Sequence, residues 1–182
     1  MASPVKPAPA AYEIIDTDPH MSRVVRYMRF SDLVTGTAVA VGGPAFLLAL
    51  QHIDPTSVKG ARTLAPTLRA AGALGLFAGF SVSYLRSSRR FWGWDENARE
   101  VAKDRYEMKS RLAKGEPLYP TSQTPSYLQD LAARYTTYSA TMLAVFPIFN
   151  LAHHQTHGID PARYYEVRDG EEDWPFDLQK DE

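Results

Sequence analysis

Two long apolar segments stand out in the pattern of hydrophobic and polar positions along this chain, the first without any charge and the second with one, Arg69, near its start. The first covers residues 33–53 and lies between Asp32 and Asp54. About twenty uncharged residues are enough for a helix to cross the hydrocarbon core of a bilayer. The second covers residues 68–85 and is followed by clustered arginine and tryptophan. The pattern predicts two membrane-spanning helices joined by a short polar connection at residues 54–67.

Small side chains recur every four residues along the second segment, at Ala71, Gly75, Gly79 and Ser83. Lipid provides no hydrophobic drive for helix pairing, so close backbone contact through small residues holds membrane helices together. We therefore expect these positions to form a helix-packing face that a larger membrane subunit covers. An alternative to a specific packing face is that glycine and alanine are simply common in membrane helices. An alternative to membrane insertion is that both segments are buried helices of a soluble α-protein.

Arginine and tryptophan side chains directly follow the second segment. Positive side chains favour the headgroup layer, and tryptophan favours the membrane interface. Five residues are expected to anchor this helix end at the membrane surface: Arg86, Arg89, Arg90, Trp92 and Trp94. Basic residues near helix ends also predict orientation, and more of them flank the terminal ends of the two segments than the connection. Both termini are therefore expected on the matrix side of a mitochondrial membrane.

The segments beyond the helix pair are charged, proline-rich or aromatic. Residues 95–114 predict a charged helix whose narrow apolar stripe is interrupted by Arg105. Residues 135–151 are uncharged, and three interpretations stay open: an interfacial helix, a third membrane crossing, or a helix packed on a protein neighbour. The acidic tail is either solvated or an extended strap in which Trp174 and Phe176 anchor a partner.

Together these elements predict an all-α membrane protein with a two-helix transmembrane hairpin. The expected regions are an extended N-terminal arm at 1–30, the hairpin at 31–88, a region with a charged amphipathic helix and an interfacial helix at 89–160, and an extended acidic tail at 161–182. Extended segments in water gain stability only from a partner surface, so the isolated chain is expected to fold poorly.

Composition removes several catalytic and cofactor chemistries. The chain has 182 residues, a net charge of −1 and no cysteine. This excludes disulfides, thiolate-bound zinc and iron–sulfur ligation, and it disfavours nucleic-acid binding. His153 and His157 are four residues apart and suggest a metal site, but no further ligands of suitable spacing accompany them. With His154 they more simply mark a helix terminus. We expect no catalytic, cofactor-binding or metal-binding residue.

Three stretches carry a resemblance to a known family: YEIIDTDPHMSRVVRYMRFSD, RRFWGWDENAREVAKDR and GEPLYPTSQTPSYLQDLAARYTTYS. They are similar to the fungal 21 kDa accessory subunit of mitochondrial NADH:ubiquinone oxidoreductase, respiratory complex I. The resemblance implies a place in the membrane arm of complex I, in the mitochondrial inner membrane. It also implies other complex I subunits and membrane lipids as partners, no cofactor, and a role in assembly or stability.

The sequence leaves functions from two other classes open. The chain could be a free-standing inner-membrane shaping or import-related protein, held by its hairpin and interfacial helix. It could also be a small membrane enzyme that uses His153 and His157. Neither function has a distinctive residue pattern in the sequence, so a non-catalytic subunit of complex I is the leading hypothesis.

Overall fold

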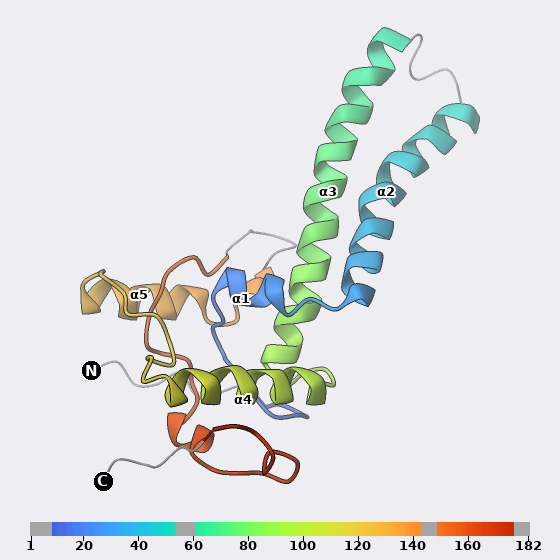
Figure 1. Ribbon diagram of the computed structural model, residues 1–182. Helices are drawn as coiled ribbons and strands as arrows, with labels where there is room; N and C mark the ends of the chain where they lie inside the picture. Colours follow the sequence, from blue (N-terminus) through green and yellow to red (C-terminus); the bar gives the residue numbers. More distant parts are fainter. Residues whose placement is uncertain (1–8, 54–60, 143–148, 177–182) are drawn as a thin grey trace.

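The structure is a computed structural model that describes residues 9–53, 61–142 and 149–176. These residues form helices and loops, and no strand occurs among them. The helices in chain order are α1 (Met21–Arg26), α2 (Phe30–Ile53), α3 (Ala61–Phe91), α4 (Ala98–Ala113), α5 (Ser126–Thr136), and the short 3-10 helices η1 (Ser139–Met142) and η2 (Pro161–Tyr164). Figure 1 shows α2 and α3 projecting from a base that contains the other helices.

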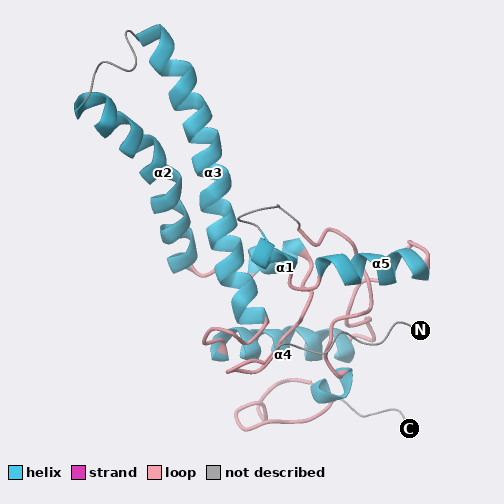
Figure 2. Cartoon of the chain, turned by 180° about the vertical axis from the view of Figure 1, so that it is seen from behind, coloured by secondary structure: helices cyan, strands magenta, loops and turns pink. Residues whose placement is uncertain are grey.

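Helices α2 and α3 contain the two apolar segments of the sequence. α2 begins at Phe30, shortly before the first segment, and includes Pro44. α3 extends the second segment at both ends, so part of the expected connection is helical. Both helices are long and apolar enough to cross a membrane. The 31 residues of α3 span about 46 Å, against about 30 Å for a bilayer core. The two helices lie side by side in Figures 1 and 2.

The described part of the N-terminal segment lies inside the base, which corrects the expected extended arm. The side chains of Ile15, Asp16 and Asp18 are buried. The Ile15 N–H donates to the carbonyl oxygen of Phe91 over 2.8 Å, and α1 follows a few residues later. This segment is therefore held by the end of α3 and does not extend away from the molecule.

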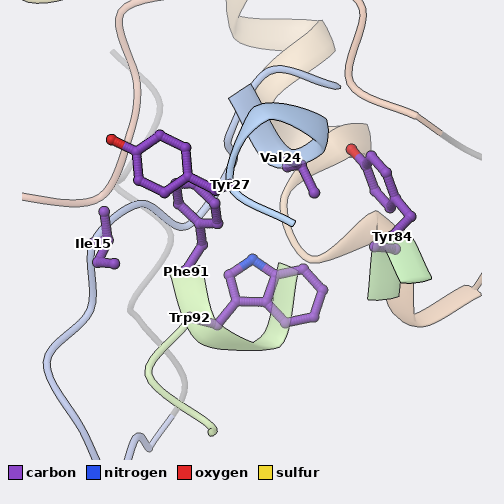
Figure 3. Close-up of a cluster of buried hydrophobic side chains, with 7 residues drawn as sticks. Ile15, Val24, Tyr27, Tyr84, Phe91 and Trp92 are labelled. Carbon is purple, nitrogen blue, oxygen red and sulfur yellow. The ribbon is translucent and has the colours of Figure 1, made fainter. Parts of the chain in front are cut away.

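A compact aromatic cluster embeds the end of α3 in the base. Figure 3 shows Phe91 and Trp92 beside residues of α1 and of the N-terminal segment. The buried members of this cluster are Ile15, Val24, Tyr27, Tyr84, Phe91, Trp92 and Ala140. Because α3 runs from the projecting pair into this cluster without interruption, the helix pair and the base are joined by a continuous helix.

The remaining helices only partly follow the sequence prediction. α4 lies within the expected residues 95–114 and is followed by Gly115 with a positive φ of 68°, a backbone conformation that glycine adopts at helix C-termini. The predicted helix over 135–151 is not continuous, because α5 ends at Thr136 and the chain around Asn150 is not helical. Residues 143–148 lie outside the described residues. No described helix in this region is long enough to form a third crossing.

Candidate functional site

The small residues of α3 face α2 at very short distance. A Cβ atom on Gly79 would lie 2.3 Å from the carbonyl oxygen of Gly36, and one on Gly75 would lie 2.4 Å from that of Ala40. The Ser83 hydroxyl donates to the Asp32 carbonyl oxygen over 2.8 Å. Side chains larger than hydrogen do not fit at these glycines. The contact surface of these residues is therefore α2.

This arrangement corrects the expectation that another polypeptide covers the small-residue face. Gly75, Gly79 and Ser83 are buried between the two helices, while Ala71 lies further along α3 and is only partly buried. A partner subunit has no access to the three buried positions. Any partner of the helix pair must contact its outer surface.

The outer surface of the helix pair consists of large apolar side chains. Exposed members include Leu33, Val34, Val41, Phe46, Leu47, Leu48, Leu50, Leu74, Leu76 and Phe77. A helix of a water-soluble protein directs such residues toward a core. Here the small residues face inward and the large ones face outward, which is typical of helices surrounded by lipid or by other membrane helices.

The beginning of α2 is fixed to the end of α3 by buried charges. Asp32 is completely buried and accepts hydrogen bonds from Arg90, in which Nη1 lies 3.2 Å from Oδ1, and from Arg86 Nε over 3.1 Å. Arg29, just before α2, binds Glu100 of α4 with an Nε–Oε1 distance of 2.7 Å. A carboxylate that is removed from water in this way needs such partners, because burial of an unpaired charge is very costly.

These contacts change the role of two predicted membrane anchors. Arg90 is buried against Asp32, and Trp92 is buried in the aromatic cluster of Figure 3, so neither reaches a headgroup layer. Arg86 and Arg89 keep partly exposed side chains while they pair with Asp32 and Asp95.

Trp94 is the remaining predicted anchor, and it is only half-buried. Its ring stacks on Tyr138 with a centroid distance of 5.8 Å. Of the five predicted anchors, Arg86, Arg89 and Trp94 therefore keep part of their side-chain surface exposed.

A second charged cluster joins the N-terminal segment to α4 and the C-terminal segment. Arg23 of α1 lies between Asp16, at 3.0 Å, and Asp104 of α4. The Tyr164 hydroxyl donates to Asp104 over 2.8 Å. Burial by itself raises the pKa of Asp16, but the neighbouring His157 and Arg23 outweigh burial and hold that pKa below its usual range. Asp16 is therefore a charged, fully paired group inside the base.

The described part of the acidic tail, residues 161–176, is also part of the base. Glu171 is buried and accepts hydrogen bonds from Arg105 Nη2 over 2.8 Å and Lys109 Nζ over 2.7 Å. Hydrogen bonds from Arg105 are the main reason that the pKa of Glu171 falls to about 2. Arg105 therefore does not weaken the buried face of α4, as its place in the apolar stripe had suggested, but holds the tail on it.

The two aromatic residues of the tail contact α4. The ring centroids of Trp174 and Phe176 are 5.3 Å and 5.1 Å from that of Tyr106. Both rings contact Tyr106 within the chain and keep part of their surface exposed, so a role of this exposed part as an anchor on a partner stays a prediction.

The three neighbouring histidines have separate partners in the base. His154 Nε2 lies 2.8 Å from Asp18, and His157 Nδ1 lies 3.0 Å from Asp16. His153 stacks on His20, with ring centroids 4.3 Å apart. The segment that carries these histidines is not helical, so the expected helix terminus is absent there. Within the described residues no group of three ligands suited to a metal ion comes together.

Sequence comparison assigns the chain to a family. A sequence model of NADH-ubiquinone oxidoreductase complex I, 21 kDa subunit, matches residues 9–96. A model of the C-terminal part of the NADH-ubiquinone oxidoreductase 21 kDa subunit matches residues 105–182. The NADH-ubiquinone oxidoreductase 20.9 kDa subunit of Neurospora crassa is 43% identical over 160 residues, which cover 88% of this chain and 84% of that protein. This chain belongs to the complex I 21 kDa subunit family.

The resemblance carried by the three sequence stretches is thus confirmed. The structure also shows how the two matched parts of the 21 kDa subunit family fit together. Arg168 of the C-terminal part binds Glu13 of the N-terminal part with distances of 2.6 Å and 3.0 Å, and Asp104, next to the boundary, binds Arg23. The parts therefore form one base, from which the helix pair projects.

Proposed function

We propose that this chain is a non-catalytic structural subunit of the membrane arm of complex I, anchored in the mitochondrial inner membrane by α2 and α3. Family membership makes it a complex I subunit and places it in mitochondria. In the helix pair, glycine lies inside and large apolar residues lie outside, which is the reverse of a helix pair in a water-soluble protein. This arrangement is the main support for membrane insertion.

The outer face of the helix pair is the surface that would contact other membrane-arm subunits and lipid. The internal contact through Gly36, Gly75 and Gly79 keeps α2 and α3 together as one element. Charged contacts of Asp32 with Arg86 and Arg90 join the beginning of α2 to the end of α3, and Arg29, just before α2, binds Glu100 of α4 in the base. Such a pre-assembled element can support assembly or stability of the membrane arm, because it adds an ordered apolar surface without first having to fold on its partner.

We also propose that the base lies on the matrix side. Most of the basic residues that flank the two apolar helices lie at the base end of the helix pair. Positive residues near helix ends tend to stay on the side of the membrane where the chain is made, which is the matrix side here. The family assignment disfavours the alternative of a free-standing membrane-shaping or import-related protein.

Blue-native electrophoresis of mitochondria that carry a tagged copy of the chain tests the proposal. The tagged chain is expected to comigrate with the large NADH-oxidising band and to stay in the membrane pellet after carbonate washing. Deletion of the chain is expected to reduce the amount of assembled membrane arm. Migration as a small homo-oligomer, or release by carbonate, contradicts the proposal.

A further inference from the structure

Helix α5 has one face that is fixed to the base. The residues Gln129, Ala132, Ala133 and Thr136 follow the spacing i, i+3, i+4, i+7 and share this face. Ala133 is buried, and the Thr136 hydroxyl donates to Asp18 in the N-terminal segment of the base. These contacts determine which side of α5 points away from the base.

The opposite face of α5 is apolar and exposed. Tyr127, Leu128, Leu131 and Tyr135 are 68%, 38%, 47% and 71% exposed. At 3.6 residues per turn, the spacing of i, i+1, i+4 and i+8 places them within an arc of about 100° on one side of the helix. Asp130 and Arg134, also exposed, lie on the flank of this side and are four residues apart. The helix therefore presents a leucine pair with tyrosine at both ends and a polar border.

The position of α5 relates this face to the proposed membrane. Figures 1 and 2 show α5 running crosswise to α3, at the height of α1 and of the first turn of α2. The apolar surface of α2 starts at this height with Phe30, which is 80% exposed. If α2 enters the membrane at its first turn, the membrane surface therefore lies at the level of α5.

We propose that α5 lies on the surface of the lipid bilayer, with Leu128 and Leu131 at the edge of the acyl chains. The inference rests on the proposed membrane insertion of α2 and α3. A lipid occupant is favoured over a protein because tyrosine at both ends suits the boundary between headgroups and acyl chains. Amphipathic helices in the plane of the membrane have this composition, and Arg134 at the border adds attraction to anionic lipid.

Photocrosslinking in the assembled complex, within its native membrane, tests this inference. Photoleucine replaces Leu131 in a tagged chain, and after illumination the adducts on the isolated chain are identified by mass spectrometry. Lipid adducts at this position are expected. Two matched positions serve as controls: Gln123 in the exposed loop before α5, and Phe46 on the outer surface of α2.

Each outcome is decisive. Lipid adducts at positions 131 and 46, severalfold more abundant than at 123, support the inference. Lipid at 46 combined with a protein adduct at 131 overturns it in favour of a partner subunit, and no adduct at 131 overturns it in favour of water. These two results leave the proposed membrane insertion intact. Absence of a lipid adduct at 131, combined with neither lipid nor a membrane-arm subunit crosslinked at 46, overturns both proposals.

Discussion

Glu171 lies between the positive side chains of Arg105 and Lys109, and all three groups are buried. From sequence alone, an arginine such as Arg105 in the apolar stripe of a helix argues against burial of that stripe, because no partner for its charge is visible. Here the counter-charge comes from a residue 66 positions further along the chain. A buried pair of this kind depends strongly on both members, because loss of either one leaves a charge without a partner.

Glu171→Gln is therefore expected to destabilise the base by about 3–5 kcal/mol, the usual cost of breaking a buried ion pair. Glu172→Gln removes the same charge from an exposed neighbouring position and is expected to change stability by less than about 0.5 kcal/mol. Chemical denaturation of the purified full chain in detergent measures both values. Equal effects of the two substitutions contradict the assigned role of Glu171.

The same carboxylate predicts a pH dependence. Hydrogen bonds, chiefly from Arg105, lower the pKa of Glu171 from 4.5 to about 2 in the folded chain. A group whose pKa is lowered by folding stabilises the folded chain fully at pH values above its unfolded pKa. This contribution is lost as the pH falls through the folded pKa. The difference in unfolding free energy between the native chain and Glu171→Gln should stay constant down to about pH 5, then shrink toward about pH 2.

Denaturation curves recorded at a series of pH values check this expectation. A difference that is already lost near neutral pH, or that persists unchanged in strong acid, shows that the Glu171 carboxylate is not the titrating group.

At the scale of elements, the two long helices and α4 were predictable, and α5 was not. An apolar run long enough to cross a bilayer is a local property of the sequence, so residues 33–53 and 68–85 identify α2 and α3. Helix α5 contains Asp130 and Arg134, and its apolar side is only a few residues long. The uncharged residues 135–151 gave a stronger signal, although α5 ends at Thr136. Apolar content alone therefore misplaced this helix.

The contact between α2 and α3 predicts different effects at two glycines of the same helix. Gly79→Ala places a Cβ atom 2.3 Å from the backbone of Gly36, whereas a Cβ atom at Gly72 has nothing within 4 Å. Gly79→Ala is expected to push the helices apart at a cost of about 1–3 kcal/mol, as overpacking does. Gly72→Ala is expected to have no such effect.

The amount of assembled complex in blue-native gels measures both variants in mitochondria. A clear loss with Gly79→Ala and an unchanged amount with Gly72→Ala agree with the close contact. Equal amounts in both variants contradict it.

At the scale of the whole molecule, the base brings together segments from both ends of the described chain. Asp16 contacts His157, and Arg23 contacts Asp104. A single sequence does not reveal such pairs, because a buried charge and a surface charge look alike in it. The flanking segments were therefore interpreted as an arm, a strap and a solvated tail. In the structure they order one another, and the anchor predicted at Arg90 and Trp92 becomes part of this interior.

The absence of cysteine from the sequence makes a direct test of orientation feasible. Under the proposed orientation, the connection between α2 and α3 faces the intermembrane space and the base faces the matrix, because basic residues predominate on the base side. A membrane-impermeant maleimide added to intact mitoplasts should therefore label Ser57→Cys in the connection. It should not label Ser126→Cys, which lies at an exposed position of the base, until detergent opens the membrane. Labelling of Ser126→Cys alone before detergent shows the reverse orientation, and labelling of both positions shows that α2 and α3 do not cross the bilayer.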